Sequence, residues 1–554
     1  MLSLLLFALG TQWVPDQGDG TYRNPILAGD YSDPDVVRVG EDYYLTASSF
    51  TNVPGLPILH SRDLVNWTII GHALTRLEPD AHYAVPRRGG GVWAPAIRHR
   101  DGKFLIYYPD PDRGIFLVTA TDPRGPWSAP VLVDDSKGVI DPAPFWDEDG
   151  SGWMVMSWAG SRAGFNNIIT LKRMNAESTR TVDAGRTIVD GAKLPPIATS
   201  FGERKWAVTE GPKLYKKDGW YYLFAPSGGV KPGWQGVLRS RRIEGPYEGR
   251  NVLDQGRTEV NGPHQGTWVT TQAGDDWFVH FQDADSYGRR VHLQPMRWKG
   301  GWPVIGADTD GDGTGEPVLR HRKPKLPRQP LAAPQADDEF DGPIGPGWQW
   351  NANPAADWMR IEDGRLRLKS VTGSPNLYEV GNLLSQKLPG ERFSATTLMR
   401  FAPLRDGERA GLAIAGRAYG FIGIERAGGA LRLVQVSNAR ADAQQPETRV
   451  AGPAIEAGPV WLRLAAEPII VHETPPTDPA FDLPPMRRAM QARVQFSYSL
   501  DGDRFIPLGD TFISRPGHWT GAQIGLLAQA PTGTSASIAT TVGHADFEWF
   551  HVGE

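Results

Sequence analysis

The sequence contains no cysteine, and this absence excludes several kinds of site. Disulfide bonds, thiol nucleophiles and cysteine-ligated zinc or iron–sulfur centres all require that residue. The chain also has little excess charge, since 58 Lys and Arg face 63 Asp and Glu, giving a net charge of -5. Such a balance gives no electrostatic reason to bind nucleic acid or an anionic membrane, so we expect neither partner.

Long apolar runs are missing as well, because no stretch reaches the roughly 18 residues that span a bilayer. Residues 1–9 are apolar apart from Ser3, and Ala8-Leu9-Gly10 has the small-x-small pattern of a signal-peptidase site. A full signal peptide has a basic start and about 15–30 residues. We therefore interpret residues 1–21 as a shortened export signal with an N-terminal segment, and expect an exported, soluble protein. The alternative is an apolar terminus with no targeting role.

Glycine, proline and tryptophan, in contrast, are abundant. The 64 Gly and 47 Pro together make up a fifth of the 554 residues, against an average of about 12%. There are as many Trp as Phe, 20 of each. Many turns and many large aromatic side chains favour short strands and sugar-like ligands.

A repeat runs through the first half of the chain. Five segments share an opening polar or aromatic residue, a small or proline residue, an apolar strand, a turn and an aromatic-rich strand. Asp-Gly turns between such strands are a strong hairpin signal. Four short strands in each of five repeats predict a five-bladed β-propeller over residues 22–317, the alternative being a β-sandwich with coincidental hairpins. The openers are Asp33, Trp93, Asp141, Glu210 and His264.

The second half has a different pattern. Residues 318–336 are basic and rich in proline, and we interpret them as a linker. Alternating strands then continue without helical periodicity, which predicts a concanavalin-like β-sandwich over residues 337–554. The prolines in residues 467–489 predict a loop there. The expected fold class is all-β.

The openers of the five repeats point to a chemistry. Equivalent positions of a propeller converge on its axis, so three carboxylates, an indole and an imidazole are expected around one pocket. Like charges raise one another's pKa, which is costly unless an enzyme needs one protonated and one ionised carboxyl. Paired carboxylates beside aromatics are typical of glycoside hydrolysis. The alternative is that each acid only caps its own strand.

Several motifs, in this order along the chain, resemble glycoside hydrolase family 43. They are Asn24-Pro25-Ile26-Leu27, Asp33-Pro34, Trp93-Ala94-Pro95, Ile140-Asp141-Pro142 and Glu210-Gly211-Pro212. The resemblance extends through the propeller and, more weakly, the sandwich. It implies an inverting exo-enzyme that releases β-D-xylose or α-L-arabinofuranose from plant cell-wall oligosaccharides.

The resemblance also implies roles for the three acids. Asp33 would be the general base that activates water, and Glu210 the general acid. Asp141 would keep Glu210 protonated and help to orient it. Asp30 and Asp35 compete for the role of base, but neither is the opener of a repeat.

Other residues are expected around the sugar. Arg289, with Arg290 as its rival, matches an arginine that contacts sugar hydroxyls, and Trp93 would stack on a sugar face. Phe50 would form another wall of the subsite, and Trp519 in the sandwich would reach the pocket rim. Arg289, Trp93 and Phe50 also have a purely structural alternative, which is a surface salt bridge for the arginine and packing for the two aromatics. For the sandwich as a whole, the alternative is an independent carbohydrate-binding module.

His264 is the one candidate metal ligand. It matches a central histidine that lies near the sugar site or helps to hold a calcium ion through water, so no cofactor is required but a structural Ca²⁺ near His264 is an expectation. Residues 308–313 begin like an EF-hand loop, yet position twelve is Leu319 instead of the glutamate that such a loop needs. We interpret that segment as a solvated turn.

The sequence leaves the sugar undecided. Between Phe50 and the next Pro-Gly lies Thr51-Asn52-Val53, where xylosidase-type relatives often have bulky aromatics. The alternatives are an enzyme specific for arabinofuranose, a retaining furanosidase and a non-catalytic sugar-binding propeller. The natural polysaccharide and the oligomeric state are not predicted.

Overall fold

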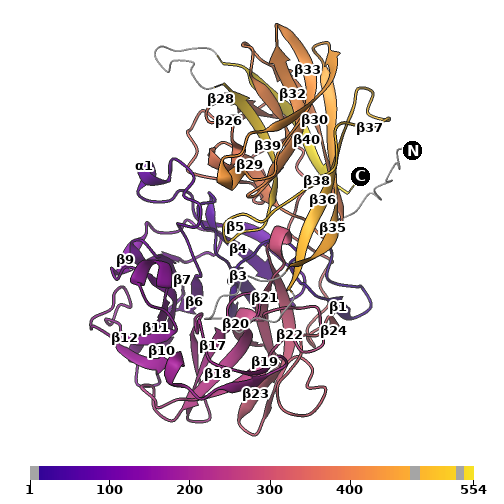
Figure 1. Cartoon of the computed structure of the whole chain (residues 1–554). Helices are drawn as coiled ribbons and strands as arrows, with labels where there is room; N and C mark the ends of the chain where they lie inside the picture. Colours follow the sequence, from indigo (N-terminus) through magenta and orange to yellow (C-terminus); the bar gives the residue numbers. More distant parts are fainter. Residues whose placement is uncertain (1–11, 474–486, 532–541, 554) are drawn as a thin grey trace.

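The structure is a computed structural model that describes residues 12–473, 487–531 and 542–553. Residues 1–11, which hold the expected signal-peptidase site, lie outside this part. The fold is all-β, as predicted: a five-bladed propeller carries a β-sandwich on one side (Figure 1).

Each blade is an antiparallel sheet of four strands in sequence order. Blade 1 contains β2 (Asp35–Val39), β3 (Asp42–Thr46), β4 (Gly55–Ser61) and β5 (Thr68–Leu74). Blade 2 contains β6 (Ala96–Arg100), β7 (Lys103–Asp110), β8 (Gly114–Ala120) and β9 (Val131–Asp134). Blade 3 contains β10 (Val139–Trp146), β11 (Gly152–Trp158), β12 (Ile168–Arg173) and β13 (Arg186–Asp190). Blade 4 contains β16 (Lys213–Lys217), β17 (Trp220–Ser227), β18 (Trp234–Ser240) and β19 (Glu248–Leu253). Blade 5 contains β20 (His264–Thr270), β21 (Asp276–Asp283), β22 (Arg289–Lys299) and β23 (Trp302–Ile305).

The predicted Asp-Gly turns form the hairpins of these blades. Asp101 and Gly102 join β6 to β7 with φ of 50° and 72°, and Asp218 and Gly219 join β16 to β17 with φ of 52° and 70°. Positive φ at both central residues is the turn geometry whose twist matches paired strands. Apolar side chains of adjacent blades then pack together, as Ile58 of blade 1 does in one cluster with Ile97 of blade 2.

Segments outside the blades join the two ends of the ring. Strand β1 (Thr21–Arg23) pairs with β24 (Arg320–Arg322), and Leu27 pairs with Val291 of blade 5. The segment that the sequence predicts as a linker therefore begins with a strand that is bonded to the N-terminal side of the propeller.

The remaining short elements lie in connections. They are α1 (Asp80–Tyr83), α2 (Gly160–Ala163), η1 (Gly191–Lys193), β14 (Ile197–Thr199), β15 (Gly202–Arg204), η2 (Asp285–Tyr287), η3 (Leu377–Glu379) and η4 (Ala441–Ala443). Within the described residues, no helix is long and apolar enough to cross a membrane.

The sandwich consists of two sheets that enclose one hydrophobic core. The first sheet contains β25 (Gln349–Trp350), β28 (Val371–Thr372), β29 (Leu384–Lys387), β31 (Arg409–Ala415), β32 (Tyr419–Ala427), β33 (Ala430–Asn438), β34 (Thr448–Ile455) and β39 (Gln523–Ala530). The second contains β26 (Met359–Glu362), β27 (Arg365–Lys369), β30 (Phe393–Ala402), β35 (Pro459–Glu473), β36 (Arg487–Ser499), β37 (Ile506–Pro507), β38 (Phe512–Ile513) and β40 (His544–Val552).

The loop predicted for residues 467–489 is wrong at both ends. Strand β35 continues to Glu473 and β36 begins at Arg487, so the two strands form a long ribbon. The proline at 468 is tolerated because β30 pairs with β35 only as far as Ala466. Beyond that residue β35 has a free edge, where a missing backbone N–H removes no ladder bond.

The two domains share an intimate interface. Ala284 and Tyr287 of the propeller belong to the hydrophobic core of the sandwich. Val53 and Trp350 donate backbone hydrogen bonds to each other at 2.9 and 2.7 Å, which extends the pairing from one domain into the other. We infer that separating the two domains would expose apolar side chains and unpaired backbone groups at this interface.

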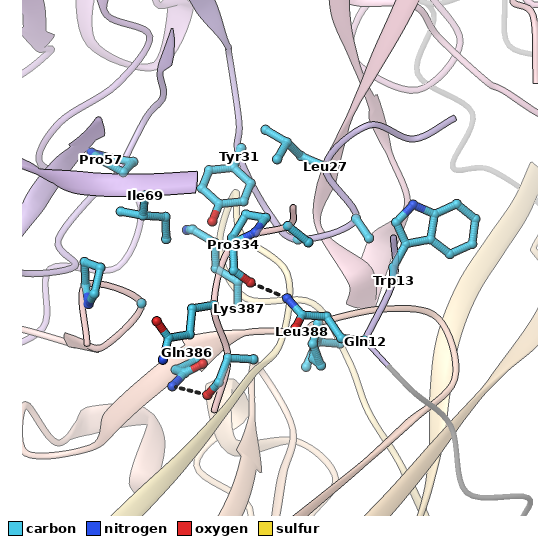
Figure 2. A pocket seen from close by; sticks show the side chains of 18 of the residues that line it. Gln12, Trp13, Leu27, Tyr31, Pro57, Ile69, Pro334, Gln386, Lys387 and Leu388 are labelled. Carbon is cyan, nitrogen blue, oxygen red and sulfur yellow. Dashed lines mark hydrogen bonds between the residues drawn. The ribbon is translucent and has the colours of Figure 1, made fainter. Parts of the chain in front are cut away.

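A crevice remains between the N-terminal segment, blade 1 and the sandwich (Figure 2). Tyr31, Gln386 and Lys387 are among the residues that line it. The amide of Gln386 donates to the backbone carbonyl of Ala336 at 3.0 Å, and the amide of Gln12 donates to that of Pro334. These two hydrogen bonds attach strand β29 of the sandwich and the N-terminal segment to the connection between the domains.

Candidate active site

The five openers gather where the inner strands of the blades begin. Asp33 and Trp93 precede β2 and β6, Asp141 lies near the start of β10, Glu210 precedes β16, and His264 is the first residue of β20. Asp33 and Asp141 both have left-handed backbone conformations, with φ of 55° and 54°. Aspartate tolerates this region better than most residues because its short side chain bonds locally, and such conformations concentrate at functional sites.

Asp33 is held as a carboxylate acceptor. The hydroxyls of Ser32 and Ser48 donate to its Oδ2 at 2.6 and 2.5 Å, and Arg289 Nη1 donates to Oδ1 at 3.2 Å. The side chain is almost fully buried. Three donors, one of them a cation, stabilise a negative charge at this position.

The rival acids are engaged elsewhere. Asp35 accepts a hydrogen bond from Thr267 at 2.5 Å and forms ion pairs with Arg98 at 2.6 Å and Lys213 at 3.4 Å. Asp30 accepts two backbone N–H groups. Both side chains therefore serve structural contacts, in agreement with the position of Asp33 in the repeat.

Asp141 and Glu210 are buried acids whose proton affinity is increased. Burial and the negative charge of Asp33 raise the pKa of Glu210 to about 7, against the opposing effect of Arg289. Burial and the charge of Glu210 raise the pKa of Asp141 to about 7, although Ser157 Oγ and the backbone N–H of Gly211 donate to Asp141 Oδ2 at 2.5 and 2.8 Å. The site therefore combines an acid that is protonated near neutral pH with a carboxylate held by a cation.

His264 contacts one of these acids directly. Its Nε2 lies 2.9 Å from Oε1 of Glu210, and its side chain is fully buried. Burial and the charge of Arg289 lower the pKa of His264 to about 3, so the imidazole is neutral. A neutral ring can donate to Glu210 or accept from it, and so fixes the orientation of the carboxyl in either protonation state.

His264 itself would hold the expected calcium ion only through water. Calcium takes roughly six to eight oxygen ligands, whereas His264 offers a nitrogen. In the described part of the chain, three acidic or histidine side chains come close enough to share an ion only at Asp308, Asp310 and Asp312. There, Asp308 is already paired with Lys299 at 3.3 Å, and three neighbouring acids in a turn are not by themselves a metal site.

Aromatic side chains from both domains line the site. The ring of Trp93 lies 6.4 Å from that of Phe50 and 6.2 Å from that of Trp519, which comes from the sandwich. Trp519 is 44% exposed, while Phe50 is buried. The guanidinium of Arg162, a residue of helix α2, lies over the ring of Trp93 at 5.4 Å.

The two candidate arginines have different partners. Arg289 contacts Asp33, and its guanidinium also lies 5.8 Å from the ring of Trp519. Arg290 points to Glu391 of the sandwich and to Gln282, at 3.0 Å from the latter. Of these two arginines, only Arg289 therefore contacts one of the three acids that open the repeats.

Several donors near the acids have no hydrogen-bond partner among the described residues. They are Arg289 Nε and Trp93 Nε1, together with His264 Nδ1, which is a donor only when Nε2 accepts from Glu210; all three atoms are buried. Because buried polar atoms are normally paired, unpaired ones beside a cluster of acids suit a polar ligand. A polyhydroxylated molecule would supply the missing partners.

Sequence reasoning missed the residues that hold the acids. Ser32, Ser48 and Ser157 bond to Asp33 and Asp141, and Gln265 donates to Asp141 Oδ1 at 3.3 Å. Serine is common and no spacing marks these positions. Gln265 follows His264 directly, and that position in the repeat was its only signal.

Comparison with known proteins supports the fold assigned to each of the two domains. The sequence profile of glycosyl hydrolases family 43 matches residues 22–303, and that of the beta-xylosidase C-terminal concanavalin A-like domain matches residues 337–553. A beta-xylosidase of Formosa agariphila is 31% identical over 591 aligned residues, covering 97% of this chain and 90% of that protein. A non-reducing end alpha-L-arabinofuranosidase of Bacteroides ovatus is 30% identical over 441 aligned residues, covering 74% and 77%. The solved structure of xylan beta-1,4-xylosidase from Bacillus halodurans C-125 is 25% identical with a TM-score of 0.79, covering 96% of this chain and 100% of that one.

Proposed function

This chain belongs to glycosyl hydrolase family 43 and is a glycoside hydrolase, and from that premise we propose that it is an inverting exo-enzyme. We propose that it removes β-linked D-xylose residues, α-linked L-arabinofuranose residues or both from the ends of hemicellulose oligosaccharides. The observation that carries the proposal is the pairing of Glu210, whose pKa is about 7, with the Arg289-bound carboxylate of Asp33.

In the proposed mechanism the two acids act from opposite sides of the glycosidic bond. Glu210 gives its proton to the leaving oxygen as the C–O bond breaks. Asp33 removes a proton from a water molecule whose oxygen bonds to the anomeric carbon, so the configuration inverts. Asp141 has a similarly raised pKa, so when it is ionised its charge favours the protonated form of Glu210, and His264 orients the Glu210 carboxyl.

The binding roles follow from the unpaired donors and the aromatic walls. Arg289 and Trp93 would donate to sugar hydroxyls, and Phe50, Trp93 and Trp519 would enclose the sugar. Because Trp519 of the sandwich lies against Trp93 and Arg289 on one side of the site, we propose that the site takes chain ends and not the interior of a polymer. Thr51 and Asn52 are buried in the connection after Phe50, and relatives with xylosidase and arabinofuranosidase names keep both sugars in the proposal.

The first test is hydrolysis of 4-nitrophenyl β-D-xylopyranoside and α-L-arabinofuranoside, with the released sugar followed by proton NMR. Inversion predicts that α-D-xylose accumulates first from the xyloside. Initial release of the β-anomer would instead identify a retaining enzyme. A folded protein without activity on either compound would favour a sugar-binding propeller.

The roles of the acids are tested by Asp33→Asn and Glu210→Gln. We expect each variant to lose about 10²–10⁴-fold in kcat while keeping its circular dichroism spectrum. The loss for E210Q should shrink with a leaving group as acidic as dinitrophenol, which needs no proton, whereas that for D33N should not. Near-normal activity of either folded variant would contradict the assignment.

Export is proposed from residues 1–9 alone. Expression of the full chain in a bacterial host, followed by fractionation and N-terminal sequencing, would test it. Cleavage after a residue near Gly10 is the expected result, and an intact N-terminus in the cytosolic fraction would count against it.

A further inference from the structure

Asp30 joins three segments of the molecule. It lies three residues before Asp33 and is only 5% exposed. Its Oδ1 accepts the backbone N–H of Arg289 at 2.8 Å, and its Oδ2 accepts the backbone N–H of Gly521 at 2.9 Å. One carboxylate therefore holds a propeller strand and a sandwich loop at the same time.

The backbones at this junction approach so closely that two positions require glycine. A Cβ atom on Gly288, whose φ is 73°, would lie 2.4 Å from the Cβ of Asp30. A Cβ atom on Gly521 would lie 2.7 Å from the backbone nitrogen of Gly288. The adjacent N–H of Ala522 donates to the carbonyl of Ser286 at 2.8 Å, so the loop is bonded to the propeller on both sides of this contact.

Each of the two bonded segments carries a residue of the site. Arg289 contacts the carboxylate of Asp33 through its side chain while its own N–H is bonded to Asp30. Gly521 is two residues from Trp519, the sandwich residue that lies against Trp93. A shift at Asp30 would therefore move the cation beside the base and the aromatic rim together.

The opposite side of the same segment is also fixed. Gly29 packs against the sandwich, where a Cβ atom would lie 3.2 Å from the Cβ of Lys387. The ammonium of Lys387 lies over the ring of Tyr31 at 5.2 Å, and both line the crevice in Figure 2. Residues 29–31 are thus clamped between strand β29 on one side and Arg289 with Gly521 on the other.

We propose that Asp30 is a positioning residue, which couples the sandwich loop bearing Trp519 to Arg289 and so sets the geometry of the sugar site. This inference rests on the proposed function for its kinetic consequences, but the coupling itself is a property of the fold. Asp30 does not contact the reacting atoms. Its effect passes through two backbone amides.

The structural part is tested by amide hydrogen exchange on the full-length protein. In Asp30→Ala, peptides that contain Arg289 and Gly521 should exchange about tenfold faster, because each amide loses its buried acceptor. Asp30→Asn, which keeps the shape and one good acceptor, should show a smaller increase. The control is Glu391→Gln, which weakens the Arg290 contact at the same domain interface and should leave both peptides unchanged.

The kinetic part uses a double-mutant cycle. We expect D30N to lower kcat/KM by about 10- to 100-fold and E391Q to change it less than twofold. If Asp30 acts by placing Trp519, D30N should cost less in a Trp519→Ala background than in the wild type. Additive effects, or wild-type exchange at both peptides in a folded D30A, would overturn the proposal. If the wild type hydrolyses neither glycoside, the proposed function fails, and the exchange result still decides the coupling.

Discussion

At the scale of single residues, burial gives Glu210 the proton affinity that a catalytic acid needs at neutral pH. Because its pKa is about 7 and the proposed mechanism requires its acid form to donate the proton, kcat/KM should fall above pH 7, by about tenfold per pH unit. Asp141 ionises in the same pH range, and its charge then opposes ionisation of Glu210. Asp141→Asn removes that charge, so the alkaline limb should move to lower pH. Initial rates of the wild type and of D141N between pH 4 and 9 measure the alkaline limb of each protein. An unmoved alkaline limb in D141N would contradict the interaction between the two acids.

The same burial should cost stability when the carboxyl is ionised. Glu210 has a raised pKa in the folded protein, so its proton favours folding at low pH and this stabilisation is lost as pH rises toward 7 and beyond. We expect Glu210→Gln to increase the free energy of unfolding at pH 8, on the order of 1–3 kcal/mol. At pH 4, where the carboxyl is mostly protonated in both states, the gain should largely vanish. Denaturant titrations at the two pH values measure this difference, and an equal effect at both would contradict the assignment.

At the scale of elements, the repeat made the three acids predictable. Asp33, Asp141 and Glu210 open the inner strands of blades 1, 3 and 4, and a five-fold arrangement brings such positions together whatever the side chains are. The serines that hold them could not be found, because they come from neighbouring positions and from second strands with no repeated identity. Strand β35 was mistaken for a loop at Pro468, since only the pairing pattern shows that this residue lies on a free edge.

The sandwich loop that carries Trp519 provides a prediction at this scale. Its indole is 44% exposed and lies against Trp93 and Arg289. Trp519→Ala should therefore raise KM about tenfold through loss of sugar contact, with a smaller change in kcat and no loss of folding. Leu500→Ala, at a similarly exposed apolar residue of the sandwich, is the matched control. Equal KM values for the two variants would show that the rim does not contact the sugar.

At the scale of the whole molecule, the two domains should unfold together. Tyr287 and Ala284 of the propeller are buried in the core of the sandwich, and backbone bonds cross the interface at Val53 and Trp350. Unfolding either domain would expose apolar surface of the other. Differential scanning calorimetry of the full chain should give one endotherm at pH 6. Two well-separated transitions would mean that the domains are energetically independent.

Residues 517–522 belong to the sandwich but contact Asp30 and Trp93 of the propeller. This arrangement has a consequence for how the two domains can evolve. Recombination that exchanged the sandwich between related proteins would separate Trp519 from Trp93, and Gly521 from Asp30. Such hybrids would keep all three acids and still lose the pocket. We therefore expect new sugar preferences in this lineage to arise from paired substitutions on both sides of the junction, with the two domains passed on as one unit.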